Sequence, residues 1–403
     1  MQFDNIRFDA NGIFTFSMGE QIECYNPSEV AMQAMLGIKV MDVYQVQRGI
    51  LNPVYIDITC IGNNTKDKYA FKAKEWLLNN ARIENNRAIW DYNYSCDFHG
   101  QKLEVPWYSA FAQAYVAEAL MYWARFDSNP IYKTLARQAI NQLLYPLEKG
   151  GCCNQILGGV WFEEIPYGKC THIFNAHLIS IIALFDAKKY LQMRETSPYI
   201  RKALRAFEKN IFRMDTGINS VYEILDTTNA ELRIVPGSEE PIILEEIQLC
   251  AGNENRVIKL NNNLCFEGTE QKILGSDWIR NEKNQLVLIK KQSAEQNNYL
   301  YFYNINTRCK HIILTIIYEV EKDTTIKLQK NCYEAGFKNL GYVKEIKLSS
   351  CKKSIDIKIP TSSFLPHLSK VYHVYHTDLL KGIYRRYPKK IYSKLISRFE
   401  SYW

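Results

Sequence analysis

The sequence predicts a mainly α-helical protein that also carries a β-sandwich-like domain. Apolar residues recur at helical spacing through most of residues 23–225, and β-branched and aromatic runs replace that spacing from about Asp226 to about Phe364. The number of helices that can pair antiparallel favours an incomplete (α/α) toroid, in which the inner helices are apolar and the loops line one open end.

The chain opens with a predicted β-hairpin over residues 1–22. Phe3–Asp9 and Ile13–Ser17 flank the turn signal Asp9-Ala10-Asn11-Gly12. A hairpin before the first helix is therefore expected.

The first helix is predicted to begin at Asn26-Pro27-Ser28-Glu29. Asparagine suits the cap, proline the first helical position, and glutamate the third position after the cap. The pattern then continues through Met32, Met35 and Val40. Further helical patterns cover about 69–82, 108–125, 131–146, 173–191 and 198–212.

The strand-rich part holds about eight short runs of β-branched and aromatic residues. Ser354–Ile359 alternates strictly, which is typical of a half-buried strand. Segments with Asn, Gly, Lys and Asp separate the runs, as connections between strands do. Other predicted strands are Leu286–Ile289, Tyr299–Tyr303, Ile312–Tyr318 and Thr325–Leu328.

Composition narrows the class of protein and its location. The 403 residues suffice for two domains, and a formal charge of +7 favours a polyanionic partner, although solubility explains such a charge nearly as well. Eleven cysteines without C-x-x-C spacing favour free thiols in a reducing compartment. With no signal pattern and no run of 18 apolar residues, we expect a cytoplasmic protein without a membrane span.

The segment Tyr384–Tyr392 near the C-terminus is basic and aromatic. A final packing helix with a solvated basic face is the preferred interpretation, and peripheral attachment to an anionic membrane is the alternative. Homodimer formation stays open, and no nucleic-acid partner is expected.

The segment Gly158–Pro166 carries the most informative chemistry. Glu163 and Glu164 are adjacent between aromatic residues and a proline, and the residue before a proline favours an extended backbone. Neighbouring side chains on such a backbone point to opposite faces, so only one of the two carboxylates can face a given cleft. Aromatic rings beside a carboxylate suit a sugar site, and a loop with solvated glutamates is the alternative.

Five motifs in order resemble the catalytic C-terminal domain of the D-glucuronyl C5-epimerases, which act on heparan-type polysaccharides and bacterial relatives of these polymers. They cover about residues 20–224 and 366–403. The motifs are Val105–Gln113 (family Trp-Tyr-Ser-Ala-Met-Ala-Gln), Trp161–Pro166 (family Trp-Tyr-Glu-Glu-Tyr-Pro), the apolar run 172–186, Asp215-Thr216-Gly217 with Val221-Tyr222-Glu223, and Tyr372–His376 (family Tyr-His-Thr-Thr-His). Because the last helices of the family resume at about Leu365, the resemblance implies a β domain inserted at 226–365 into a discontinuous epimerase-like domain of residues 23–225 and 366–403.

The resemblance implies C5 inversion of D-glucuronate or a related hexuronate within an acidic polysaccharide, such as a bacterial capsule. Inversion needs two acid/base groups on opposite faces of the sugar and no metal or redox cofactor. The residues matching the acid/base set of the family are Glu164, Tyr222 and Tyr372. Tyrosine is a weak base at neutral pH, so His373, His376 or an arginine would have to favour its phenolate.

Further polar and aromatic residues are candidates for substrate binding. Helix capping explains Asn26 fully, and packing or helix-end roles are the alternatives for most of the others. The candidates are Trp107, Tyr108, Gln113, Trp161, Glu163, Tyr167, Asn175, His373, His376, Tyr25 and Tyr92.

Several positions depart from the family pattern. Ile165 replaces a tyrosine, Leu225 stands where an arginine is frequent, and Ala176 and Tyr115 replace glycine and glutamine. A lost carboxylate clamp would affect substrate choice first. A glycan-binding protein without activity, or a hydrolase or lyase on the same fold, is therefore the alternative, although Glu163 and Glu164 make a poor hydrolase pair.

Overall fold

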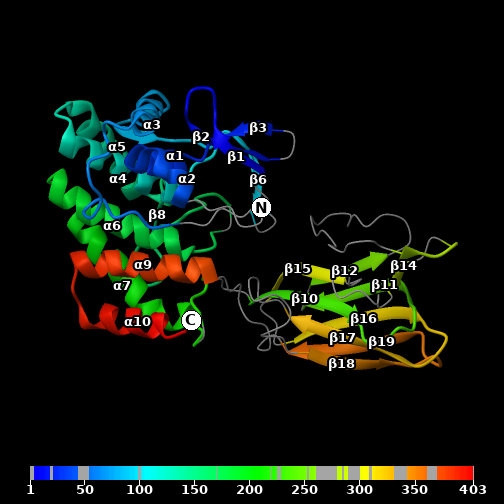
Figure 1. The fold of residues 1–403 in the computed structure, drawn as a ribbon. Coiled ribbons are helices and arrows are strands. Elements are labelled where there is room, and N and C mark those ends of the chain that lie inside the picture. Colours follow the sequence, from blue (N-terminus) through cyan, green and yellow to red (C-terminus); the bar gives the residue numbers. More distant parts are fainter. Residues whose placement is uncertain are drawn as a thin grey trace. The chain divides into compact units, whose positions relative to one another are not determined.

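The computed structural model describes residues 4–18, 21–43, 54–98, 101–168, 170–217, 219–224, 228–251, 254–259, 279–283, 286–288, 300–307, 311–330, 343–360 and 370–402. The chain divides into two compact units (Figure 1). Unit 1 comprises Met1–Ile224 and Lys370–Trp403, and unit 2 comprises Leu225–Ser369.

Unit 1 is built on a succession of helices that pack on one another. α1 packs on α3 and α4, α4 on α5 and α6, α6 on α7 and α9, and α9 on α10 (Figure 1). The helices are α1 (Pro27–Leu36), α2 (Val40–Val43), α3 (Lys68–Asn79), α4 (Ala110–Phe126), α5 (Pro130–Leu144), α6 (Phe174–Tyr190), α7 (Thr196–Met214), α9 (Lys370–Arg386) and α10 (Lys390–Glu400), with short 3₁₀ turns at Gly37–Lys39 and Leu147–Lys149. The predicted helices at 69–82, 108–125, 131–146, 173–191 and 198–212 are therefore confirmed to within two or three residues at each end.

The first helix begins as predicted but ends earlier. Asn26 Oδ1 accepts the backbone N–H of Ser28 at 3.0 Å, and Pro27 is the first helical residue. Gly37 then adopts φ +62°, and a Cβ there would lie 2.3 Å from the carboxylate of Asp67, which caps α3. The glycine therefore ends α1 before Val40, because only a residue without a side chain fits beside Asp67.

Glu29 has a different role from the one that the capping pattern predicts. Its Oε1 accepts the side-chain amide of Asn26 at 3.1 Å, and the carboxyl group is buried. Burial raises the pKa of Glu29 to about 8, against the opposing effect of the Asn26 hydrogen bond. The folded protein therefore holds this proton where the unfolded chain releases it.

Replacing Glu29 by glutamine is expected to flatten part of the pH dependence of stability. The unfolded chain loses the Glu29 proton near pH 4.5 and the native state near pH 8, so this residue lowers stability as the pH rises between those values. One pKa unit corresponds to about 1.4 kcal/mol, which makes the contribution a few kcal/mol at most. Urea unfolding between pH 5 and 9 measures it. Parallel pH profiles of the free energy of unfolding for variant and wild type would contradict the assignment.

The N-terminal hairpin is part of a larger sheet. β1 (Asp4–Phe8) pairs with β2 (Phe14–Met18) around a turn in which Asp9 Oδ1 accepts the N–H groups of Asn11 and Ile13. β3 (Gln21–Cys24) adds a third strand, which the turn signals did not predict. Unit 1 also holds three two-stranded pairs, β4–β5 (Arg82–Glu84, Arg87–Ile89), β6–β7 (Cys96–Phe98, Gln101–Leu103) and β8–β9 (Cys153–Asn154, Trp161–Phe162).

In its described residues, unit 2 holds two antiparallel sheets (Figure 1). The apolar residues of the two sheets share one core. The four-stranded sheet has the order β15-β10-β17-β18, and the other has the order β13-β14-β11-β16-β19 with β12 beside β11. The alternation of buried and exposed residues along β16 explains how one face of this strand reaches the core. The strands are β10 (Thr228–Pro236), β11 (Ile242–Ala251), β12 (Glu254–Lys259), β13 (Ile279–Arg280), β14 (Leu286–Leu288), β15 (Leu300–Thr307), β16 (His311–Glu319), β17 (Thr324–Lys330), β18 (Val343–Leu348) and β19 (Ser354–Pro360).

The basic segment near the C-terminus is largely paired inside unit 1. Arg386 lies buried against Asp186 and Asp57, and Lys389 bonds to Glu208 at 2.9 Å. Arg386 is therefore not solvated, whereas the helix after this segment, α10, buries one face and leaves Lys390 and Lys394 exposed, as predicted for a final packing helix with a solvated basic face. None of the described helices is long and apolar enough to cross a membrane.

Candidate active site

Three separate stretches of unit 1 bring the predicted acid/base residues together. Glu164 follows β9, Tyr222 lies in the extended segment 219–224, and Tyr372 lies in the first turn of α9. The segment 219–224 is held at the start of α6, because the N–H of Phe174 donates to the Tyr222 carbonyl at 2.9 Å. Residues distant in sequence therefore meet at one place.

The side chains of these residues are in contact. The hydroxyl of Tyr222 lies 3.4 Å from Glu164 Oε1, toward which it can donate, and the rings of Tyr222 and Tyr372 meet edge to face with centroids 4.6 Å apart. Glu223 is also buried, and the charge of the nearby Glu164 helps to raise its pKa. We name Glu164, Tyr222, Glu223 and Tyr372 the acid–tyrosine cluster.

Burial determines the protonation of the cluster. It raises the pKa of Glu164 to about 8, against the opposing hydrogen bond from Tyr222. It also raises the pKa of Glu223 to about 8, against a hydrogen bond from Thr171. The pKa of Tyr222 lies well above 10 because of burial and the nearby glutamates. At neutral pH both carboxyl groups are therefore mostly protonated, and either can exchange a proton near physiological pH.

The two histidines of α9 do not supply the positive charge that was considered for a phenolate. His373 Nδ1 accepts the N–H of Ser220 at 2.9 Å, and its Nε2 donates to the Phe399 carbonyl at 2.9 Å. His376 Nδ1 lies 2.8 Å from Ser220 Oγ. Burial lowers the pKa of both rings, so both are neutral and serve to hold the segment that carries Tyr222.

Glu163 and Glu164 have separate surroundings, as expected for neighbours on an extended backbone. Glu163 is only 1% exposed, and its Oε1 lies 2.7 Å from His172 Nδ1 and 2.8 Å from Asn154 Nδ2. Glu164 belongs to the acid–tyrosine cluster instead. Oε1 of Glu163 is thus engaged by the protein itself.

Aromatic residues predicted for substrate binding pack around the cluster. Tyr92 stacks on Trp107 with centroids 3.7 Å apart, and both share a small apolar core with Tyr222. Tyr167 packs against the same core, and its hydroxyl accepts the N–H of Tyr108 at 3.1 Å. These rings therefore lie near the acid–tyrosine cluster. That any of them stacks on a sugar stays a prediction.

The remaining candidates lie in other surroundings. Tyr25 bonds to Asp9 and Glu23 of the N-terminal sheet, so the structure does not bring it into the cluster. Trp161 is fully buried and stacks on His177 with centroids 3.8 Å apart. Gln113 Nε2 donates to the Trp90 carbonyl at 3.2 Å, and Asn175 is buried in the first turn of α6.

The departures from the family pattern are mostly buried. Ile165 and Ala176 belong to the same small core as Tyr222. The hydroxyl of Tyr115 bonds to that of Tyr375 at 2.5 Å. Leu225 lies outside the described residues.

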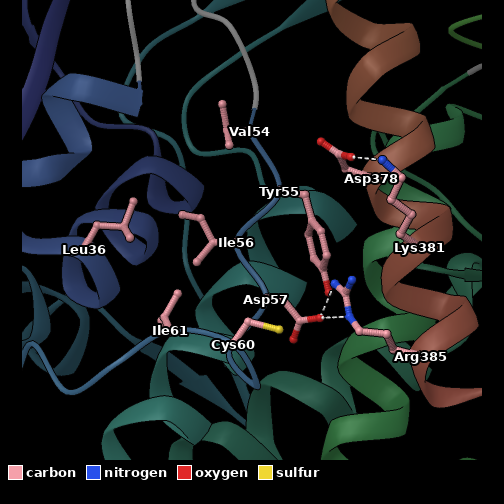
Figure 2. Close-up of a pocket in the computed structure, with 10 residues that line it drawn as sticks. All are labelled: Leu36, Val54, Tyr55, Ile56, Asp57, Cys60, Ile61, Asp378, Lys381 and Arg385. Atoms are coloured by element: carbon pink, nitrogen blue, oxygen red, sulfur yellow. Dashed lines mark hydrogen bonds and ion pairs between the residues drawn. The ribbon is translucent and has the colours of Figure 1, made fainter. Parts of the chain in front are cut away.

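A cavity of about 410 Å³ opens elsewhere in unit 1 (Figure 2). Its lining includes the apolar residues Leu36, Ile56 and Ile61, and charged side chains from α9 and the segment 54–61. Figure 2 shows these charges paired with each other, Arg385 with Asp57 and Lys381 with Asp378. None of the lining residues belongs to the acid–tyrosine cluster.

Sequence reasoning missed two residues of the site region, Glu223 and His172. Glu223 directly follows Tyr222, so its position in the same motif was the available signal. His172 is the first residue of the motif 172–186, but nothing in the sequence indicates its left-handed backbone, φ +52°, or its contact with Glu163. Among the described residues no group of three or more His, Cys, Asp or Glu side chains could hold a metal ion.

The fold and the cluster define a helical domain with buried and half-buried acid and tyrosine groups suited to proton transfer. Residues 84–235 match the family described as D-glucuronyl C5-epimerase C-terminus. Over 168 residues the chain is 23% identical to a D-glucuronyl C5-epimerase of Caenorhabditis elegans. The aligned part makes up 38% of this chain and 27% of the relative. The resemblance drawn from the motifs is therefore confirmed over residues 84–235, most of which lie in unit 1.

Proposed function

We propose that the protein is a C5-epimerase acting on D-glucuronate or a related hexuronate within an acidic polysaccharide. The observation that carries this proposal is the contact of Tyr222 with both Glu164 and Tyr372, at residues that match the acid/base set of the family. The match over residues 84–235 supports it. The part aligned with the C. elegans relative is only 27% of that protein. The activity and the substrate of this chain are therefore proposals.

The proposed reaction moves one proton off C5 and another onto it. A base on one face removes the C5 proton, and the electron pair of the C–H bond passes into the adjacent carboxylate. An acid on the opposite face then protonates C5, which leaves the formula unchanged and the configuration inverted. Glu164 would act on one face and Tyr222 or Tyr372 on the other.

The electrostatics favour Glu164 over Tyr222 as the group that changes protonation near neutral pH. Its pKa of about 8 places it close to neutral pH, whereas burial opposes ionisation of Tyr222. Tyr222 can donate toward Glu164 Oε1, so the two groups are within reach of a shared proton. The reaction class needs no redox cofactor.

The fold, the polymeric partner and the location of the protein are part of the same proposal. The helical succession of unit 1 would form part of an (α/α) toroid, and unit 2 a β-sandwich with a role in polymer contact. The formal charge of +7 would attract a polyanionic chain such as a capsular polysaccharide in the cytoplasm. Peripheral membrane attachment would depend on the exposed lysines of α10, because Arg386 is internally paired.

Replacing Tyr372 by phenylalanine is expected to abolish deuterium incorporation at C5 when a uronate polymer is incubated in deuterium oxide. Phenylalanine keeps the ring that packs on Tyr222 and removes the hydroxyl. Loss of an acid/base group costs about 10²- to 10⁴-fold in rate. NMR of the polymer measures the incorporation.

Tyr375→Phe is the matched control. Tyr375 lies on the same helix, and its hydroxyl bonds to Tyr115 instead of the cluster, so this variant should exchange C5 protons at the wild-type rate. Retained exchange in a folded Tyr372→Phe protein would remove Tyr372 from the acid/base set.

A further inference from the structure

Glu164 and Tyr222 belong to two loops whose relative placement decides their contact. The hydroxyl-to-carboxylate distance of 3.4 Å is longer than an ordinary O–H···O bond, so a small shift of either loop would separate them. The interactions that hold the loop of Glu164 against the loop of Tyr222 therefore determine this contact.

The loop of Glu164 is anchored through the preceding residue. The N–H of Glu163 donates to the Cys152 carbonyl at 3.0 Å, and the Glu163 carbonyl accepts the N–H of Ala110, at the start of α4, at 3.2 Å. Its side chain is buried and accepts from Asn154 and His172 at 2.8 and 2.7 Å. Residue 163 is therefore held by both main chain and side chain.

The loop of Tyr222 is anchored through His172 and its neighbours. The His172 carbonyl accepts the N–H of Ile224 at 3.2 Å, and Ile173 pairs with Glu223 in an antiparallel bridge. His172 itself adopts φ +52°, a left-handed conformation that a non-glycine residue holds only where its surroundings enforce it. Its ring reaches Glu163 from this conformation.

We propose that Glu163 and His172 form a positioning pair that holds Glu164 against Tyr222. The pair is the side-chain link between the loop after β9 and the segment that pairs with residues 222–224. Glu163 would then not contact substrate, in contrast to its prediction as a substrate-binding residue. The inference deepens the proposed epimerase function and rests on it for its kinetic test.

Substitutions at the two positions separate hydrogen bonding from chemistry. Glu163→Gln keeps an acceptor oxygen for His172 and Asn154 but cannot act as a base. His172→Asn keeps a donor nitrogen where Nδ1 lies, and asparagine tolerates the left-handed backbone. His172→Leu fills similar space without a donor.

Epimerisation kinetics form the first measurement. Glu163→Gln and His172→Asn should stay within about threefold of wild type, whereas His172→Leu should lower kcat by about 10- to 100-fold with KM little changed. The pH–rate inflection of His172→Leu should also move upward, because loss of the Tyr222 contact removes a bond that favours ionised Glu164. The other titratable groups that face Glu164 are Tyr92 and Glu223.

The second measurement needs no turnover. In protein labelled with ¹³C at the glutamate carboxyl carbon, the Glu164 signal is assigned by its loss in Glu164→Gln and titrated in each variant. His172→Leu should raise the pH midpoint of this signal, and His172→Asn should leave it unchanged. Inactive wild-type protein would overturn the proposed function, and this titration would still decide on the pair.

Two results would overturn the positioning pair. One is loss of activity in folded Glu163→Gln, which would make Glu163 a chemical or substrate-binding group. The other is a His172→Leu protein that matches wild type in both kcat and the Glu164 titration. Thermal unfolding of each variant confirms that it is folded.

Discussion

Replacing Glu164 by glutamine is expected to reduce formation of the epimerised uronate by about 10²- to 10⁴-fold. Glutamine keeps an oxygen toward which the Tyr222 hydroxyl can donate, but it neither takes nor gives a proton at neutral pH. Wild-type activity should inflect near pH 8, where burial places the pKa of Glu164. The rate of product formation as a function of pH measures both effects.

Glu29→Gln is the matched control for this substitution. Glu29 is also a buried glutamate whose pKa burial raises to about 8, but it bonds to the cap of α1. Its variant should retain the wild-type rate and the inflection near pH 8. Equal activity of Glu164→Gln and wild type would show that Glu164 takes no part in proton transfer.

Replacing Arg386 by methionine is expected to lower the free energy of unfolding by about 3–5 kcal/mol, because it leaves the buried Asp186 without its counter-charge and removes one of the two cations that pair with Asp57. Arg386 Nε donates to Asp186 at 2.8 Å, and its Nη2 donates to Asp57 at 3.0 Å. Burial opposes ionisation of Asp57, yet Arg386 and Thr59 hold the pKa of this residue well below its usual range. Urea unfolding at pH 7 measures the loss.

The neighbouring Arg385 provides the control. Its side chain is 44% exposed, against 8% for Arg386, and it pairs with Asp57 in the lining of the cavity in Figure 2. An ion pair exposed to this degree contributes about 1 kcal/mol or less, so Arg385→Met should be nearly neutral. Similar losses in the two variants would contradict the assignment of Arg386 as the buried counter-charge.

Local signals in the sequence predicted most of the regular structure. Asn26 and Pro27 marked the start of α1 because a cap is a short-range interaction, and the alternation of Ser354–Ile359 marked β19. The end of α1 could not be predicted, because Gly37 is tied to Asp67, thirty residues later. Likewise, nothing local to Arg386 reveals that Asp57 and Asp186 neutralise it.

For the site, too, the sequence predicted some features and missed others. Family motifs singled out Glu164, Tyr222 and Tyr372, which the structure brings into contact. The roles of the neighbouring groups depend on burial, which no motif records. His373 and His376 are neutral supports of Ser220 for this reason, and the Glu163–His172 contact depends on one left-handed residue.

Proton exchange at C5 is the sharpest test of the proposed epimerisation. Wild-type protein is incubated with glucuronate polymers in deuterium oxide, and NMR detects deuterium at C5 of the product. The product is also tested for new reducing ends and for unsaturated uronate. We expect deuterium at C5 of both epimers, with the chain length unchanged. Binding without exchange, new reducing ends, or unsaturated uronate would contradict it, and would indicate a glycan-binding protein, a hydrolase or a lyase respectively.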